Sequence, residues 1–296
     1  MDTEDGRRFT LRSRWGHGAA AHPQLAAALA QGRADYERLL ADIERHGDVL
    51  RAIAQEHDPG NPLAPCWNNV WFTALDAAAL VSFLLTRPPK HYLEIGSGNS
   101  TMFTSHTLRT AALPTTISSI DPRPRAEIDA LCHRKIRAPL EDCDIALFDE
   151  LAAGDILFFD GSHRVFMNSD VTVFFLEVMQ RLKPGVLVHI HDIFLPADYP
   201  PDWSDSLFAE QYMLAAMLLC GAPPFRVILP NYFVCSDPPL AARARAVLSA
   251  MGIPFNYPNA AKTLSSSFWL EITKTGSGQF DALAAPSRPH GEEPRS

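Results

Sequence analysis

Residues 91–101 combine an apolar run, a Gly-Ser-Gly turn and small hydroxylated side chains, a pattern that suits ligand binding. Glycines at positions 96 and 98 let the backbone turn tightly and approach a ligand closely. The pattern predicts a strand that ends at Gly96, a loop through Ser97 and Gly98, and a helix that Ser100 caps. The N-terminus of such a helix offers free backbone N–H groups to a ligand.

Two carboxylates accompany this turn. Glu94 lies two residues before the first glycine, where it would repel a pyrophosphate but could pair with a cationic group of a ligand. Asp121 ends the next apolar run, 25 residues after Gly96, where a carboxylate can accept hydrogen bonds from ribose hydroxyls. Thr101 stands where a dinucleotide fingerprint would have its third glycine. The alternative is that Gly-Ser-Gly is only a strand–helix turn.

A second group of polar residues follows two later apolar runs. Asp160 and His163 come after residues 156–159, and His191 and Asp192 come after residues 186–190. Because the carboxyl ends of parallel strands open into one crevice, we expect these side chains to meet there. Asp160 and Asp192, with His191 as a third ligand, could hold Mg²⁺, which prefers oxygen ligands. His163 could take a proton from a hydroxyl nucleophile, because its ordinary pKa is near neutrality.

Each of these residues also has a purely structural interpretation. A strand-end aspartate such as Asp192 often caps the following turn, and a loop histidine beside a carboxylate is a common hydrogen-bonding pair, which would explain His163. His189 precedes the strand end and is expected to be packed in the core. The loop 196–203 could cover the site as a lid, or it could be a proline-stiffened surface connection. Trp67 and Trp71, four residues apart, could contact a substrate or form one packed face.

The elements that position these residues follow from the spacing of apolar side chains. Short apolar runs alternate with helical patterns, and they cover residues 92–95, 116–120, 156–159, 186–190, 225–229 and 268–272, with a weaker run near 134–137. Strands that alternate with helices predict a parallel sheet covered on both faces, a doubly wound three-layer α/β/α sandwich.

Helical patterns occupy residues 22–55, about 71–85, 169–182 and about 207–219. We expect a loosely ordered segment 1–21, an N-terminal helical cap 22–88, a central domain 89–275 and a disordered tail 276–296 that lacks hydrophobic periodicity.

Composition narrows the function classes. The 296 residues include 26 Lys and Arg against 34 Asp and Glu, a formal charge of −8, which argues against nucleic-acid binding and against an anionic membrane surface. The N-terminus lacks the pattern of a secretory signal, and no apolar run reaches the roughly 20 residues of a membrane span. The five cysteines are odd in number and lack C-x-x-C spacing, so we expect reduced thiols in a cytoplasmic protein.

Together, Glu94, the two glycines, Ser100 and Asp121 make the sequence similar to the class I S-adenosylmethionine-dependent methyltransferases. The resemblance covers roughly residues 90–273, and its first motif reads E-x-G-x-G-x-S. It implies that Glu94 and the Gly96–Gly98 loop hold the amino-acid end of S-adenosylmethionine, that Asp121 holds the ribose, and that residues near 140–143 contact the adenine. It also implies a seven-stranded sheet whose last strand, 268–272, is antiparallel.

The spacing Asp160…His163 also resembles the metal-dependent small-molecule O-methyltransferases of the macrolide-sugar type, which carry a D-x-x-H arrangement. Two features differ from that subset. His191-Asp192 stands where the subset has two adjacent acidic residues, and the 32 residues from Asp160 to Asp192 are a slightly long separation.

The resulting prediction is methyl transfer from S-adenosylmethionine to a hydroxyl of a small polar molecule, with possible assistance from Mg²⁺ and with homo-oligomers possible. The catalytic residues would be His163, Asp160 and Asp192. The residues expected to bind the cofactor are Glu94, Gly96, Ser97, Gly98, Ser100, Asp121 and Asp160. The alternatives are a non-catalytic S-adenosylmethionine-binding or interaction protein and a nicotinamide-dependent oxidoreductase.

Overall fold

The computed structural model describes residues 11–72, 74–124, 127–255 and 265–274, and the expected tail 276–296 lies outside them. Its seven-stranded sheet has the order β3-β2-β1-β4-β5-β7-β6. The strands are β1 (His91–Ile95), β2 (Thr116–Ile120), β3 (Arg134–Ile136), β4 (Ile156–Phe159), β5 (Leu187–Ile190), β6 (Phe225–Pro230) and β7 (Phe268–Ile272). All pairs are parallel except those of β7, which runs antiparallel to both β5 and β6.

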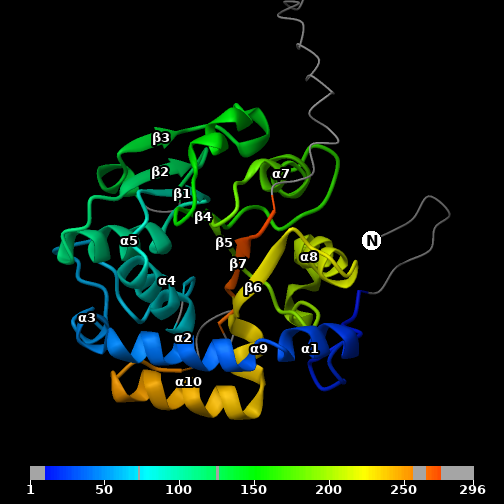
Figure 1. Ribbon diagram of the computed structural model, residues 1–296. Helices are drawn as coiled ribbons and strands as arrows, with labels where there is room; N and C mark the ends of the chain where they lie inside the picture. Colours follow the sequence, from blue (N-terminus) through cyan, green and yellow to red (C-terminus); the bar gives the residue numbers. More distant parts are fainter. Residues whose placement is uncertain (1–10, 73, 125–126, 256–264, 275–296) are drawn as a thin grey trace, which may run out of the picture.

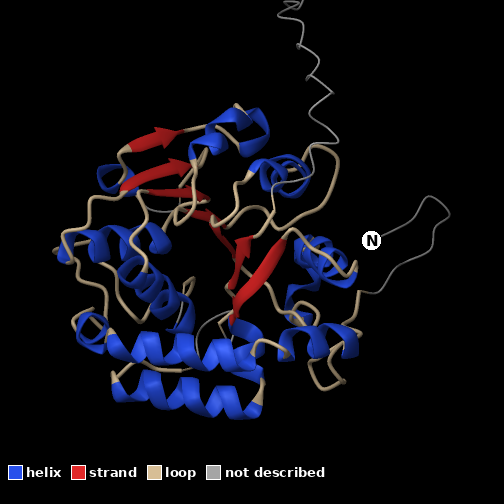
Figure 2. Cartoon of the chain, in the orientation of Figure 1, coloured by secondary structure: helices blue, strands red, loops and turns tan. Residues whose placement is uncertain are grey.

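Helices cover both faces of this sheet (Figure 2). Helices α4 and α5 lie on one side of it, and α7 and α8 lie on the other (Figure 1). The helices are α1 (Pro23–Ala30), α2 (Arg33–Arg45), α3 (Gly47–Arg51), α4 (Ala74–Thr86), α5 (Asn99–Thr110), α6 (Asp170–Val173), α7 (Met179–Arg181), α8 (Glu210–Leu219), α9 (Asn231–Ser236) and α10 (Pro238–Ala250). The predicted doubly wound sandwich with an antiparallel last strand is therefore confirmed.

The predicted strands agree with the structure to within one residue at each end. The agreement has a physical cause, because strands of a sheet covered on both faces are apolar throughout. All four residues of β4 are buried, and Phe159 at its end stacks on Phe174 with ring centroids 4.0 Å apart. Ser169 caps the predicted helix that follows β4 by accepting a hydrogen bond from the backbone of Thr172. A π-helical turn at Phe174–Val178 separates α6 from α7 within that helix.

Two predicted helix starts are three residues too early, and hydrogen bonds explain both. Helix α4 begins at Ala74 rather than at residue 71, because the Asn69 side chain holds the preceding residues in a turn. Helix α8 begins at Glu210 rather than at residue 207. The backbone N–H groups of Ala209 and Glu210 both donate to the carbonyl of His163, at 2.7 and 3.2 Å.

The N-terminal helices pack against the C-terminal part of the chain. Helix α2 lies beside α10, which the sequence did not predict (Figure 1). Helix α10 starts with Pro238, and the Asp237 side chain accepts a hydrogen bond from the backbone of Leu240. This Asp-Pro start is a recognisable helix signal that the apolar spacing alone did not reveal.

The loop 196–203 is held by residues near the N-terminus. The Asp198 carboxylate accepts hydrogen bonds from the backbone N–H groups of Arg14 and Trp15, at 2.5 and 2.8 Å. His17 hydrogen-bonds the Asp198 carbonyl at 2.8 Å, and Ser13 donates to the carbonyl of Tyr199. Residues 13–17 thus clamp this loop, an arrangement that no sequence pattern predicted.

A buried carboxylate joins helix α4 to the last strand. Asp76 is fully buried and accepts hydrogen bonds from the backbone N–H groups of Ser266 and Ser267, at 3.0 and 2.8 Å, and from the amide of Asn231 at 2.8 Å. Ser266 in turn donates its hydroxyl to Asp192 at 2.9 Å. The position of Asp192 therefore depends on residues about 75 and 115 positions away in the sequence.

Candidate active site

The predicted glycine loop lies between β1 and α5. Gly96 has a φ of +78°, and a Cβ atom there would lie 1.8 Å from the carbonyl oxygen of Asp160, so no other residue fits without displacing β4. Ser97 donates its backbone N–H to the Asp121 carboxylate at 2.8 Å, and the backbone of Arg123 donates to the other oxygen of that carboxylate. The loop and Asp121 are thus joined directly by a hydrogen bond, a contact that the sequence analysis did not predict.

Glu94 lies beneath this loop rather than on its surface. It is fully buried, and its carboxyl group accepts hydrogen bonds from the hydroxyls of Ser100, Thr101 and Tyr92. The prediction that Ser100 caps α5 is wrong, because Gly98 is the N-cap residue and the Ser100 hydroxyl is bound to Glu94. Glu94 therefore supports the loop from below.

Burial raises the pKa of Glu94 to about 8, against the opposing effect of the hydroxyl donors. The folded protein then keeps a proton that the unfolded chain releases above its ordinary pKa of 4.5. The stabilisation of the folded state by protonated Glu94 is complete below pH 4.5 and is lost as the pH rises through about 8.

We expect Glu94→Gln to reduce the loss of folding stability at high pH, because the amide side chain cannot ionise. The melting temperature of the variant, measured from pH 4.5 to pH 8, should fall less with rising pH than that of the wild type. The exposed Glu177→Gln serves as the control and should follow the wild type. Parallel curves for Glu94→Gln and wild type would contradict a protonated Glu94.

A cavity of about 370 Å³ opens above the loop. Gly96, Ser97, Asp121, Leu140 and Asp160 are among the residues that line it. Its wall therefore combines the glycine turn, the carboxylate predicted to hold a ribose, and part of the segment predicted to contact an adenine. Glu94 is absent from the described lining. These features fit a nucleoside with an attached amino-acid chain, such as S-adenosylmethionine.

A second cavity, of about 470 Å³, lies between the N-terminal cap and the same loop. Trp71, Met102, Asp160 and His191 are among its lining residues. Asp160 and Ser97 line both cavities, so the two spaces meet at these residues. The Asp160 side chain is 30% exposed, which makes it the carboxylate that a molecule in either cavity can contact.

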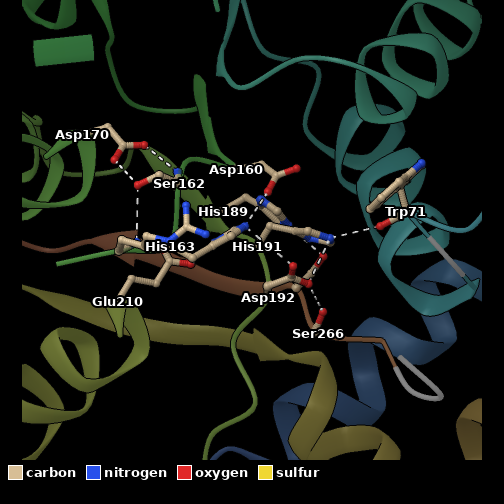
Figure 3. Close-up of polar contacts among 12 residues, drawn as sticks. Trp71, Asp160, Ser162, His163, Asp170, His189, His191, Asp192, Glu210 and Ser266 are labelled. Carbon is tan, nitrogen blue, oxygen red and sulfur yellow. Dashed lines mark hydrogen bonds and ion pairs between the residues drawn. The ribbon is translucent and has the colours of Figure 1, made fainter. Parts of the chain in front are cut away.

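The expected cluster at the strand ends is formed (Figure 3). The Nε2 atom of His163 lies 3.3 Å from Asp160 and 3.7 Å from Asp192, and its Nδ1 atom lies 2.6 Å from Glu210. His163 and Asp192 both have left-handed backbones, with φ of +59° and +54°. His191 lies beside Asp192, with its Nε2 atom 3.5 Å from that carboxylate.

His163 is buried and lies outside the described lining of both cavities, behind Asp160. Burial by itself would lower the pKa of the His163 imidazole, but the adjacent Glu210, Asp160 and Asp192 outweigh burial and raise that pKa well above its usual value. The His163 side chain is thus held among three carboxyl groups, whose charges favour the protonated imidazolium form. The pKa of Asp160 is lowered overall: burial raises it, but His191 and His163 outweigh that effect.

Glu210 is the site residue that sequence reasoning did not select. It starts α8, 47 residues after His163, and is fully buried. Burial raises the pKa of Glu210 to about 7, and His163 opposes that shift. A lone acidic residue at the start of a largely apolar helix is an ordinary sequence feature, so only the three-dimensional contact reveals its role.

The magnesium site predicted from Asp160, Asp192 and His191 is not formed. Within residues 11–72, 74–124, 127–255 and 265–274, no group of three or more His, Cys, Asp or Glu side chains has a suitable arrangement for a metal ion. The reason is geometric, because the His163 imidazole lies within 4 Å of both Asp160 and Asp192. An imidazolium there supplies the positive charge that a cation between the two carboxylates would supply.

His189 is buried, as predicted. It stacks on Phe158 with ring centroids 3.7 Å apart, and its Nε2 atom hydrogen-bonds Ser267 at 2.7 Å.

The two tryptophans of the N-terminal cap, Trp67 and Trp71, differ in environment. Trp67 is fully buried, whereas Trp71 is 53% exposed on the wall of the second cavity.

Part of the chain resembles a known protein family. Residues 93–193 match a family model described as a methyltransferase domain. The matched segment runs from β1 to just beyond β5, and so includes the glycine loop, Asp121, Asp160, His163 and Asp192. It covers about a third of the chain. The chain matches no protein of curated function.

Among solved structures, this chain is similar to a Podospora anserina methyltransferase with bound SAH. That pair shows 15% identity, coverage of 79% of this chain and 88% of the other, and a TM-score of 0.41. The plantazolicin methyltransferase BamL, in complex with a triazolic desmethylPZN analog and SAH, shows 14% identity, coverage of 66% of this chain and 81% of the other, and a TM-score of 0.42. These likenesses are too distant to assign a substrate.

In the part of the chain that the structure describes, no helix has the length and apolar character needed to cross a bilayer.

Proposed function

We propose that this protein is an S-adenosylmethionine-dependent methyltransferase that methylates a hydroxyl group of a small polar molecule. The observation that carries the proposal is the meeting of the two cavities at Ser97 and Asp160. One cavity has the features of a cofactor site, and the match of residues 93–193 to a methyltransferase domain supports that use. The other cavity offers room for an acceptor beside the same carboxylate.

The residues have separate roles in this proposal. S-adenosylmethionine supplies the methyl group. Asp160 would accept a hydrogen bond from the acceptor hydroxyl and align its oxygen. It would take the hydroxyl proton as the oxygen–methyl bond forms and the sulfur–methyl bond breaks, leaving S-adenosylhomocysteine. The His163 imidazolium keeps Asp160 ionised and oriented from behind, and Glu210 fixes the imidazole ring through Nδ1. His163 is thus proposed as a positioning residue rather than as the base that the sequence indicated.

Calorimetric titration of S-adenosylmethionine into the full chain tests the cofactor half of the proposal. The titration is run once with Mg²⁺ and once with EDTA, which also tests the metal assistance predicted from the sequence. Saturable binding in both conditions is the expected result. Absence of heat with folded protein would overturn the proposal. Cofactor binding without turnover over a broad acceptor panel would favour a non-catalytic S-adenosylmethionine-binding protein.

Asp121→Asn should weaken S-adenosylmethionine binding about tenfold. The substitution replaces a charged acceptor of ribose hydrogen bonds by a neutral one, at a cost of roughly 1.5 kcal/mol. The exposed Asp205→Asn, which changes the same charge outside both cavities, should leave the Kd unchanged. Equal affinity of Asp121→Asn and wild type would remove Asp121 from the cofactor site.

A further inference from the structure

The cap residues that face the second cavity form a turn organised by one side chain. The amide nitrogen of Asn69 donates to the carbonyls of Cys66 and Phe72, at 2.9 and 3.0 Å. The amide oxygen of Asn69 accepts from the backbone N–H groups of Trp71 and Phe72, at 3.2 and 2.7 Å. Four hydrogen bonds from a single residue hold this turn, so the residues it presents have defined positions.

The turn presents Val70 and Trp71 to the cavity, with exposed fractions of 44% and 53%. The backbone carbonyl of Trp71 faces the ring of His191, whose Nε2 atom lies 3.2 Å away (Figure 3). This contact ties the turn to the end of β5, beside Asp160 and Asp192. A large aromatic surface is therefore held in place on the same cavity wall that carries the proposed catalytic carboxylate, and it is not buried by the protein itself.

The charge of the wall limits what can bind there. Among the described residues that line the second cavity, there is no Lys or Arg, and Asp160 is the one carboxylate. A phosphate or carboxylate on the acceptor would find no Lys or Arg to pair with, only the imidazoles of His57 and His191, and it would face Asp160. The volume of about 470 Å³ lies within the usual range of small-molecule pockets.

We propose that the methyl acceptor is a planar aromatic alcohol, neutral or cationic, whose ring packs against Trp71 while its hydroxyl reaches Asp160. This inference rests on the proposed function, and it narrows the acceptor from any small polar molecule to one class. Apolar side chains such as Met102 and Phe72 complete the wall around such a ring, and Asn68 and Asn69 provide polar edges. Anionic acceptors and non-planar polyols are excluded from the class.

The test uses the full chain saturated with SAH and four small probes: catechol, dopamine, 3,4-dihydroxybenzoate and methyl α-D-glucopyranoside. Binding is measured by calorimetry, and methylation is measured separately with S-adenosylmethionine. Catechol and dopamine should bind and be methylated. Dihydroxybenzoate should bind at least about tenfold more weakly than catechol because of its added negative charge, and the glucoside should show no binding.

Trp71 is then varied in a matched pair. Trp71→Phe keeps an aromatic face and should bind catechol within about threefold of the wild type. Trp71→Leu keeps an apolar side chain without that face and should bind catechol roughly tenfold more weakly, the upper range of one aromatic contact. Both variants should retain wild-type affinity for S-adenosylmethionine, which shows that they are folded.

The outcomes separate this inference from the proposal on which it rests. If S-adenosylmethionine binds but no ring probe does, or if the glucoside or the benzoate binds as well as catechol, the acceptor class is wrong and the methyltransferase proposal stands. Equal catechol affinity of Trp71→Leu and wild type would also overturn the class. If S-adenosylmethionine itself fails to bind, the proposed function fails.

Discussion

Replacing Asp160 by Asn should lower kcat by a factor of about 10² to 10⁴, the usual contribution of a positioned proton acceptor. The amide has nearly the same shape, but it cannot take a proton, and it leaves the His163 imidazolium with one ionised partner fewer. The Kd for S-adenosylmethionine should change by a much smaller factor than kcat. The Asp160 carboxylate also lines the first cavity, but the backbone of Asp160, whose N–H donates to Ile95 at 2.8 Å, is unaffected. Rapid-quench turnover and calorimetry measure the two quantities separately.

Asp155→Asn is the matched control, because Asp155 is a buried aspartate that immediately precedes β4, the strand that Asp160 follows. Its carboxylate accepts hydrogen bonds from the backbone of Lys90, His91 and Ala152, far from either cavity lining. It should lower stability without lowering kcat at a temperature where the protein is folded. A similar kcat in Asp160→Asn and Asp155→Asn would show that Asp160 does not accept the proton in the reaction.

Replacing Gly96 by Ala should destabilise the protein by on the order of 3–5 kcal/mol, the combined cost of a left-handed non-glycine residue and of an overpacked contact. The added Cβ would lie 1.8 Å from a backbone carbonyl that cannot rotate away. For a domain of this size, the melting temperature should fall by on the order of 10 °C. Thermal unfolding followed by calorimetry provides the measurement.

Gly98→Ala is the matched control in the same loop, since a Cβ atom at position 98 would meet nothing within 4 Å. Its melting temperature should stay within about 2 °C of the wild type, the scale expected for a change below 1 kcal/mol. Equal melting temperatures of Gly96→Ala and Gly98→Ala would contradict the close contact between Gly96 and the Asp160 carbonyl.

The fold could be predicted from the sequence because most of its strands are predominantly apolar. Runs such as 156–159 and 268–272 are short and apolar apart from Glu271, so both their existence and their limits are evident. The helix starts at 74 and 210 could not be placed, because they depend on the Asn69 side chain and on the His163 carbonyl, which are contacts rather than periodicities.

The site could be predicted in part for a similar reason. The order of strands brings Asp160, His163 and Asp192 together whatever else surrounds them, since strand ends in a parallel sheet share one edge. The sequence could not show that His163 lies behind Asp160, nor that Glu210 is its closest partner. Both facts depend on where the connection from β5 to α8 passes, and the sequence contains no periodic signal for that path.

The order of strands also constrains how the chain can assemble as it is synthesised. Among the described strands, β6 pairs with β7 alone, and β7 is the last to be made. Strands β1 to β5 can pair as they emerge, which brings the glycine loop to Asp160 early. Ser266 reaches Asp192 only when β7 inserts between β5 and β6. The cofactor half and the contacts of His163 with Asp160 and Glu210 can thus form first. The hydrogen bond that holds Asp192 awaits the most distant pairing, which is expected to be among the slower steps of folding.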